Sequence, residues 1–240
     1  MKYATGRLAL QGASLTVHPG EFAVILGANG CGKSTMLRII AGMQKPSAGE
    51  VRIAGQDITQ LSGRALSEAR MSLGMVFQHA HLVKRRSVLA NVLTGTLGRH
   101  RTIYTAMGGL PAKELPHAIN CLDQVGLGAL APQRASTLSG GQAQRAAIAR
   151  ALAQRPQVLL ADEPVASLDP EAAEDVMRLL RRLASDHGIG VLCVLHQPDL
   201  ARRYADRLLG LRQGVIAFAD APATISDAAI NGLYEGFSPS

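Results

Sequence analysis

The chain has 240 residues, of which 47% are hydrophobic, 18% charged and 3% aromatic, and its formal net charge is +7. This apolar content excludes an intrinsically disordered chain and can supply the core of one large domain, or of one domain with a subdomain. No apolar run approaches the roughly 18 residues of a membrane-spanning helix. The first ten residues lack the apolar core of a signal peptide, so export by that route is not expected.

The cysteines and arginines indicate the redox compartment and the kind of binding partner. Cys31, Cys121 and Cys193 are far apart in the sequence and form no CxxC pair, which favours free thiols in a reduced cytosol. All but five of the 25 basic residues are arginines, a side chain suited to phosphates and anionic headgroups. A solvated basic surface is an equally good interpretation of the same charge.

Short strands alternate with turns and one helix in the first 80 residues. The apolar and turn patterns predict strands at 8–17, 22–27, 50–55 and 72–78, and a helix at 34–42 that ends at Gly42. The run at 22–27 is continuously apolar, as in a strand that is buried on both faces.

The pattern changes at about residue 80 and changes back at about residue 156. The middle is expected to be mostly helical, with helices at 88–97 and 143–154. Strands are then predicted at 157–162, 190–196, 207–212 and 215–219, with helices at 171–184 and near the C-terminus. Strands that alternate with helices predict a parallel sheet covered on both faces, into which the helical middle is inserted.

A nucleotide-binding motif follows the buried strand. The sequence GANGCGKST fits G-x-x-x-x-G-K-[ST], between a strand and a helix as that motif requires. Its backbone N–H groups and the helix N-terminus are suited to phosphate oxygens. The candidate nucleotide-binding residues are Gly27, Ala28, Asn29, Gly30, Cys31, Gly32, Lys33, Ser34 and Thr35.

The last three residues of this motif have separate expected roles. Lys33 should reach the β- and γ-phosphates, Ser34 should bind Mg²⁺, and Thr35 can bond the α-phosphate. ATP and Mg²⁺ are therefore the expected cofactors. The alternative interpretation is an ordinary glycine turn before a helix. The buried strand before the motif and the helix after it argue against this alternative.

Two carboxylates follow a second buried strand, at the end where α/β sheets bind ligands. Asp162 suits the Mg²⁺ site, and Glu163 suits a general base that positions water for attack on the γ-phosphate. An acidic cap before Pro164 would explain the pair equally well if the phosphate-binding motif were not present.

A third motif indicates the family. LSGGQAQR begins at Leu138, just before a long predicted helix. The phosphate loop, this signature and the acidic pair, in that order, resemble the nucleotide-binding domain of ABC-type ATPases. The resemblance implies an α/β P-loop NTPase core with a mostly parallel sheet, an N-terminal antiparallel β portion and an inserted helical subdomain. We expect the core at about 1–80 and 156–240 and the subdomain at about 81–155, within one domain.

The resemblance also implies roles for single residues. Gln78 corresponds to the glutamine of the Q-loop, which acts in catalysis and on the metal, and Asp169 corresponds to the D-loop aspartate. His196 corresponds to the switch histidine that contacts the γ-phosphate, although a lone histidine there would more often be an ordinary strand-end residue. Tyr3 corresponds to the aromatic residue that stacks on adenine.

Members of this family pair head to tail, with two ATP molecules between two domains. The helical insertion is expected to carry the signature away from the chain's own phosphate loop and toward that of a partner. Ser139, Gly140 and Gly141 would offer a hydroxyl and exposed N–H groups at a helix start, a second anion-binding end, and Gln142 is a further candidate for this nucleotide contact. One copy of each motif is present, so the simplest partner is a second copy of the chain.

Longer stretches, at 82–101, 133–152, 161–170 and 195–214, resemble the ATP-binding subunits of phosphonate importers. The resemblance implies an energy-coupling ATPase for phosphonates or a related oxyanion, peripheral on the cytoplasmic face of the inner membrane. Its partners would be two transmembrane permease subunits and, indirectly, a periplasmic or extracellular substrate-binding protein, with no nucleic acid. The alternatives are a transporter of another solute and a soluble ABC ATPase that acts on nucleic acid or the ribosome.

Two further expectations concern single segments. Lys33 and the helix N-terminus should stabilise a Cys31 thiolate, making it the most reactive thiol, whereas Cys121 and Cys193 should be buried. The alternative is that Cys31 points away from reagents. Basic clusters at 84–86 and at Arg99 and Arg101 flank the apolar stretch 88–97, which we expect to face the permease subunits; solvated charge at the ends of a core helix is the other interpretation.

Overall fold

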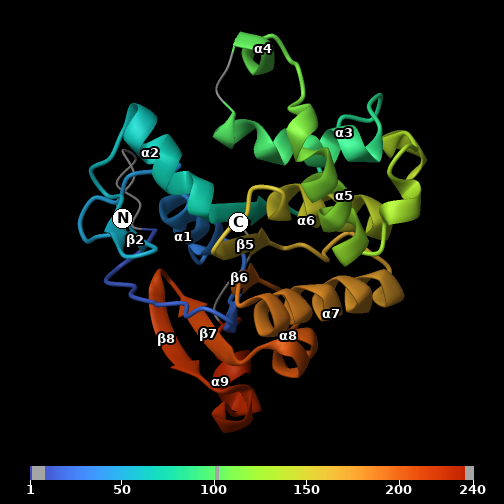
Figure 1. Ribbon diagram of the computed structural model, residues 1–240. Helices are drawn as coiled ribbons and strands as arrows, with labels where there is room; N and C mark the ends of the chain where they lie inside the picture. Colours follow the sequence, from blue (N-terminus) through green and yellow to red (C-terminus); the bar gives the residue numbers. More distant parts are fainter. Residues whose placement is uncertain (2–8, 101–102, 236–240) are drawn as a thin grey trace.

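A six-stranded sheet organises the computed structural model, which describes residues 1, 9–100 and 103–235. The strand order is β4-β5-β6-β1-β7-β8 (Figure 1). Neighbouring strands are parallel from β4 to β7, and β8 is antiparallel to β7. The bounds are β1 Phe22–Leu26, β4 Leu73–Val76, β5 Val158–Asp162, β6 Gly190–Val194, β7 Arg207–Arg212 and β8 Val215–Asp220. The mostly parallel α/β sheet expected from the sequence is thus confirmed.

Alternate residues of the central strands enter two separate cores. Val24 and Cys193 belong to the core shared with α6 (Gly140–Leu152), α7 (Pro170–His187) and α8 (Pro198–Tyr204). Ile25 and Leu192 belong to the opposite core, which includes buried residues of α1 (Lys33–Ile40). Because both faces are covered, the strands are apolar throughout instead of alternating.

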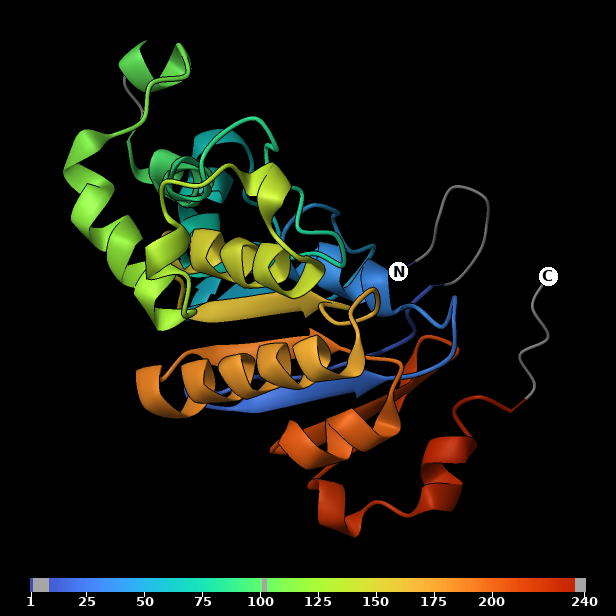
Figure 2. The same ribbon diagram turned by 90° about the vertical axis from the view of Figure 1, so that its right-hand side faces the viewer.

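The regular elements described between β4 and β5 are all helical. They are α3 Val88–Leu93, α4 Ile103–Ala106, α5 Leu115–Gln124 and α6, with short 3-10 turns η2 Thr94–Arg99, η3 Ala112–Glu114, η4 Gly128–Leu130 and η5 Ala135–Thr137. The expected helix at 88–97 is therefore an α-helix that ends at Leu93 and continues as a 3-10 helix. Helix α6 contacts β4 as well as α3, α5 and α7, and α4 projects farthest from the sheet (Figures 1 and 2).

The expected strand at 8–17 does not form over its described residues, 9–17, and Leu8 lies outside them. Gly12 has a φ of 60°, which turns the chain, and Gln11 N–H donates to Gly214 O instead of joining a ladder. The antiparallel β structure described in the N-terminal part is the short pair β2 (Arg52–Ile53) and β3 (Gln56–Asp57). Helix α2 (Gly63–Ala69) and η1 (Arg70–Ser72) then lead into β4.

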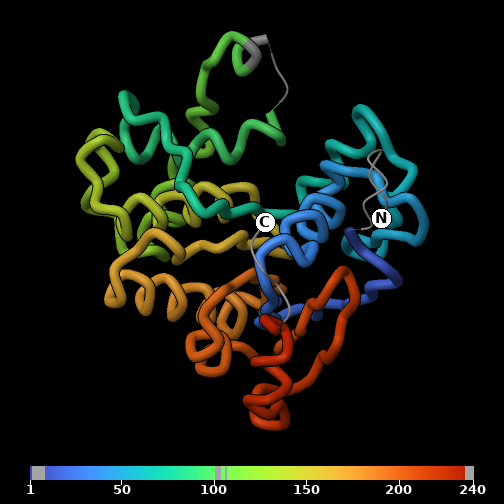
Figure 3. Tube along the Cα trace, turned by 180° about the vertical axis from the view of Figure 1, so that it is seen from behind, coloured from blue at the N-terminus to red at the C-terminus, as the bar shows by residue number. Residues whose placement is uncertain are grey.

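The segment from α1 to α2 and the helical segment between β4 and β5 lie on opposite sides of the molecule (Figure 3). Seen from behind, the segment that contains α1 and α2 lies opposite the green and yellow helical segment (Figure 3). The red β7–β8 pair is followed by η6 (Pro222–Thr224) and α9 (Asp227–Asn231), the expected C-terminal helix. No helix in the described ranges is both long and apolar enough to cross a membrane.

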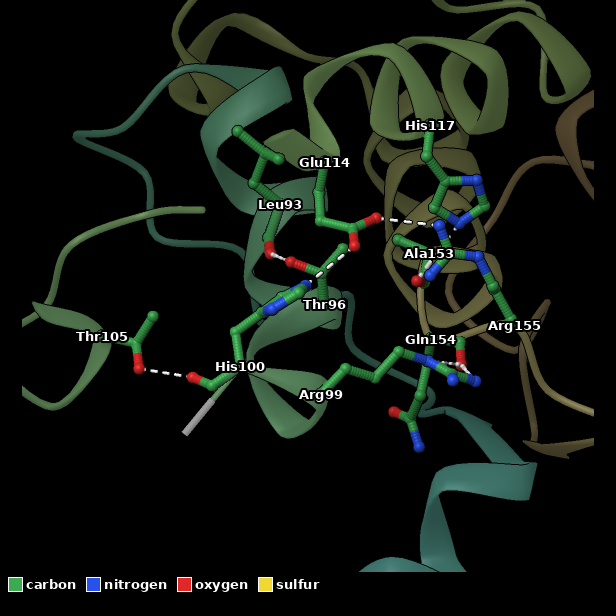
Figure 4. A network of polar contacts seen from close by, with 10 residues as sticks. All are labelled: Leu93, Thr96, Arg99, His100, Thr105, Glu114, His117, Ala153, Gln154 and Arg155. Carbon is green, nitrogen blue, oxygen red and sulfur yellow. Dashed lines mark hydrogen bonds and ion pairs between the residues drawn. The ribbon is translucent and has the colours of Figure 1, made fainter. Parts of the chain in front are cut away.

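A polar network closes the outer end of the helical segment (Figure 4). Glu114, which is 8% exposed, bonds His100 Nε2 at 2.7 Å and Arg155 Nη2 at 2.9 Å. Burial alone would raise the pKa of Glu114, but the hydrogen bonds from His100 and Arg155 outweigh it, so its pKa lies below the ordinary value. Arg99 donates to Gln154 O at 2.8 Å in the same region, so it ties η2 to the end of α6 and is not simply a solvated charge.

Candidate functional site

Four adjacent parallel strands end at one edge of the sheet, and the main candidate residues follow them there. Gln78 comes two residues after β4, Glu163 directly after β5, His196 two residues after β6, and Gly27 directly after β1. The carboxyl ends of parallel strands are where open α/β sheets bind ligands. The structure therefore brings these four segments, far apart in the sequence, to one edge.

The phosphate loop joins β1 to α1. Gly32 is the N-cap of α1 with a φ of 118°, and an added Cβ would lie 2.5 Å from Ala9 O, so glycine is required there. Lys33 Nζ turns back and donates to Gly27 O at 2.7 Å and to Ala28 O at 3.0 Å. The ammonium group thus lies over the loop, where phosphate oxygens would replace the two carbonyls.

The charge of Lys33 is held in a partly desolvated place. The residue is 6% exposed, and burial lowers its pKa, while the charges of Cys31, Glu163 and Asp162 oppose this shift. Asn29, Gly30 and Ser34 are exposed at the mouth of the loop, and Thr35 is buried. The motif residues therefore offer exposed backbone and one exposed hydroxyl beside a buried cation.

The expected exposure of Cys31, on which its expected reactivity depended, is wrong. Cys31 is 2% exposed and belongs to the core on the α1 face of the sheet. Burial raises its pKa and outweighs Lys33 and the backbone N–H groups that favour the thiolate. The motif supplies the positive surroundings that the sequence indicated, but the side chain points into the core. Cys121 and Cys193 are buried as expected.

Asp162 ends β5 with a buried oxygen, Oδ1, that has no hydrogen-bond partner among the described residues. Burial raises the pKa of Asp162 and Glu163 adds to the shift, while Arg38, Lys33 and His196 oppose it. A buried carboxylate oxygen without a partner is costly, and a cation would satisfy it.

Mg²⁺ usually takes one or two carboxylates, with phosphates and waters completing its coordination. Asp162, with the exposed side chains of Ser34 and Gln78 in the neighbouring segments, fits that chemistry. The parts of the chain that the structure describes contain no cluster of three or more His, Cys, Asp or Glu that could hold a metal alone. The set therefore suits a metal that arrives with phosphates.

Glu163 and His196 form a hydrogen-bonded pair between Oε1 and Nε2. Glu163 has a φ of 50°, a conformation that non-glycine residues rarely adopt, and its N–H donates to Val194 O at 3.2 Å. Backbone outliers of this kind gather at functional sites. The Glu163 side chain is 22% exposed, so water can reach it, and the hydrogen bond with His196 fixes the direction of its carboxylate.

The signature lies at the start of α6. Ser139 Oγ accepts from Gln142 N–H at 3.2 Å, and Gln142 Oε1 accepts from Ser139 N–H at 2.9 Å, which is a capping box. Gly141 is buried, and an added Cβ would lie 2.8 Å from Ala172 Cβ, so only Ser139 and Gly140 fit the expectation of exposed backbone.

The D-loop residue adjoins this signature. Gly140 lies next to Leu168, and Asp169 caps α7 by accepting from Ala172 N–H at 2.9 Å. The structure thus groups the signature with the D-loop. The expected adenine-stacking residue, Tyr3, lies outside the described residues.

Sequence reasoning missed three residues near the site. Gln144 and Arg150, on α6, bond the backbone on either side of Gln78. No local signal distinguishes them, because α6 also carries Gln142 and Arg145. Tyr234 has a buried hydroxyl with no partner among the described residues; burial raises its pKa, and the backbone of Gly27 opposes the shift, so the C-terminal segment reaches the phosphate loop.

Comparison with known proteins agrees with this site. The Phosphonates import ATP-binding protein PhnC of Frankia casuarinae is 52% identical over 209 residues, which cover 87% of this chain and 83% of that protein. PhnC 3 of Nostoc sp. is 46% identical over 233 residues, which cover 97% of this chain and 88% of the relative.

Solved structures show the same architecture. An ATP-binding cassette of an ABC transporter in its ADP conformation has a TM-score of 0.86 and 29% identity, covering 98% of this chain and 96% of its own. A dimeric cassette in a post-hydrolysis state with ADP and phosphate bound has a TM-score of 0.76 and 34% identity, covering 89% and 90%. The ABC transporter family matches residues 10–166. The chain belongs to the ATP-binding cassettes of the ABC transporter family.

Proposed function

We propose that this chain is the ATP-hydrolysing, energy-coupling subunit of a bacterial ABC importer for phosphonates or a related oxyanion. The ATPase activity is supported by three features at one edge of the sheet: the Lys33 loop, the Asp162 oxygen that has no partner in the described parts of the chain, and the Glu163–His196 pair. The relatives named as phosphonate import proteins cover most of the chain, and they support the solute class.

ATP binding would begin with an exchange of partners at Lys33. Its ammonium group leaves the carbonyls of Gly27 and Ala28 and bonds phosphate oxygens. The N–H groups of the loop and the N-terminus of α1 hold the phosphate chain. Because the Lys33 charge is already partly desolvated, little further water has to be removed from it when nucleotide binds.

Hydrolysis would depend on Glu163 as the general base. The carboxylate takes a proton from water as the water oxygen bonds the γ-phosphorus, and the bond from that phosphorus to the β–γ bridging oxygen breaks, so that ADP and phosphate leave. His196 holds Oε1 of Glu163 in place. Ser34, Asp162 and Gln78 would hold Mg²⁺, which neutralises phosphate charge when it is bound. His196, which follows β6 at this edge, would also contact the γ-phosphate, the role that the family resemblance implies for the switch histidine.

The catalytic unit would be a head-to-tail dimer of two copies. Ser139 and Gly140 present an exposed helix start, which suits an anion, and they lie beside the Asp169 segment, which would contact the same partner. The similar cassette with ADP and phosphate is itself dimeric. A site built from the phosphate loop of one copy and the signature of the other is incomplete in a single chain.

The assembly would include two permease subunits and, indirectly, a substrate-binding protein outside the membrane. We place the chain on the cytoplasmic face of the inner membrane, held there by its partners. We further propose a single ATPase domain, with a core at about 1–80 and 156–240 and a helical subdomain at about 81–155. The all-helical stretch between β4 and β5 supports that division.

Reconstitution tests this function. The chain would be co-purified with its permease subunits, placed in proteoliposomes and supplied with binding protein loaded with methylphosphonate, phosphate or a sulfonate. We expect the phosphonate-loaded protein to stimulate ATP hydrolysis most. Equal stimulation by each solute, or by none, would contradict the solute assignment. Salt-sensitive binding of the free chain to DNA or RNA, with no membrane partner, would favour the soluble ATPase instead.

A further inference from the structure

Side chains of α6 hold the backbone on both sides of Gln78. Gln144 Nε2 donates to Phe77 O at 2.9 Å, one residue before Gln78. Arg150 donates from Nη2 to Ala80 O and from Nη1 to His81 O, both at 2.8 Å. Three hydrogen bonds to three carbonyls thus bracket Gln78, which is exposed.

The Gln144 end of this bond is buried. Gln144 is 2% exposed and Phe77 is half-buried, so the Gln144 amide has little access to water that could replace this bond. Loss of such a bond leaves a buried polar group unsatisfied, which makes the contact specific for the observed backbone position. The end of β4 is therefore fixed to the second turn of α6.

The contacts of Arg150 hold a strained turn. His81 has a φ of 46°, in the left-handed region that side chains other than glycine rarely adopt. Its ring packs edge-to-face on Phe77, with centroids 5.7 Å apart. The planar guanidinium group bonds two successive carbonyls from two different nitrogens held in one plane, whereas a lysine has a single ammonium nitrogen. The backbone from Phe77 to His81 is thus hydrogen-bonded to side chains of α6 at both ends.

We propose that Gln144 and Arg150 are positioning residues for Gln78, and that they fix the reach of its carboxamide toward Mg²⁺ bound with ATP. The inference rests on the proposed function, because it takes Gln78 as an oxygen ligand of that metal. Neither residue touches the nucleotide or the metal itself. Groups that orient metal ligands in this way typically change metal affinity by roughly 10- to 100-fold when they are altered.

Matched variants of the same helix separate positioning from packing. Gln144→Leu removes the amide but keeps a buried side chain of similar size, and Arg150→Lys keeps the charge but loses the fork. The controls are Gln154→Leu and Arg145→Lys. Gln154 donates to the carbonyls of Arg70, which precedes β4, and of Leu73, the first residue of β4. Arg145 donates to Val125 O. Neither control residue therefore contacts the Q-loop turn.

The readout is nucleotide binding, measured by calorimetry on a Glu163→Gln background so that ATP is not consumed. ATP is titrated in EDTA and then at rising Mg²⁺. We expect Gln144→Leu and Arg150→Lys to raise by about tenfold the Mg²⁺ concentration at which half of the Mg²⁺-dependent gain in ATP affinity is reached. Their affinity for ATP in EDTA should be unchanged. The two controls should match the parent in both conditions. Melting temperatures identify any variant that fails to fold, in which case the other variant of the pair decides.

A double-mutant cycle with Gln78→Ala completes the test. If Gln144 acts through Gln78, Gln144→Leu adds nothing to the Mg²⁺ requirement once Gln78 is truncated. Additive effects, or a parent-like Mg²⁺ requirement in both single variants, would overturn the positioning role while leaving the ATPase function intact. Absence of Mg²⁺-dependent ATP binding in the parent chain would instead contradict the proposed function itself.

Discussion

Glu163 Oε1 and His196 Nε2 are hydrogen-bonded to each other where the neighbouring strands β5 and β6 end. The two residues are 33 positions apart in the sequence, and each alone has an ordinary structural explanation. Their pairing gives Glu163, the residue that follows Asp162, a defined direction, which a general base requires.

The thiol at Cys31 should react slowly. Because Cys31 is buried and burial raises its pKa, we expect maleimide to label it no faster than Cys121, whose pKa burial raises to about 11. Labelling with and without Mg-ATP, read by peptide mass spectrometry, checks this. Rapid labelling of Cys31 that Mg-ATP prevents would show that the loop opens far beyond the structure described.

The Glu114 network should make stability depend on acid. The pKa of Glu114 is lowered in the folded state, so its contribution is present above the unfolded value of about 4.3 and is lost as pH falls through the folded value. Glu114→Gln should lower the free energy of unfolding by about 1 to 2 kcal/mol at pH 7, and by less at about pH 3.5.

Urea unfolding at the two pH values measures this difference. The control is Glu50→Gln, because Glu50 pairs with Arg52 on the surface, where an ion pair contributes little. An equal loss in the two variants, or a Glu114→Gln effect that does not depend on pH, would mean that packing and not charge explains the network.

The basic segment Lys84, Arg85 and Arg86 is exposed immediately after the Q-loop turn. Reversing Arg85 and Arg86 to Glu should impair co-purification with the permease subunits while leaving basal ATP hydrolysis within about twofold of the parent, because surface substitutions rarely unfold a protein. The control is Lys45→Glu with Arg182→Glu, which makes the same charge change at other exposed positions. Equal assembly of both double variants would show that residues 84–86 are only solvated.

The core of the site could be predicted because its signals are local. The apolar run of β1 and the glycine motif after it determine the phosphate loop, and the apolar run before Asp162 determines the second carboxyl end. Helix α7 was expected from its apolar face, and the structure extends it at both ends to Pro170–His187.

What the sequence did not predict depends on contacts between distant residues. Gln144 and Arg150 meet the Q-loop 67 to 70 positions away, and no local pattern indicates such contacts. Cys31 was misjudged because the motif shows the nearby charge but not the core beneath the loop. The predicted strand at 8–17 was wrong because alternation of apolar and polar residues predicts an extended segment but not a strand to pair with.

The most direct test of the account is Glu163→Gln, compared with Lys33→Ala. Glu163→Gln keeps the shape of the side chain but removes the base, so hydrolysis should fall roughly 10²- to 10⁴-fold while ATP still binds. An ATP-bound dimer should therefore accumulate in light scattering. Lys33→Ala should lose nucleotide binding and form no such dimer. Near-parental hydrolysis by Glu163→Gln, with no ATP-dependent dimer, would contradict the assignment of this site as the ATPase centre.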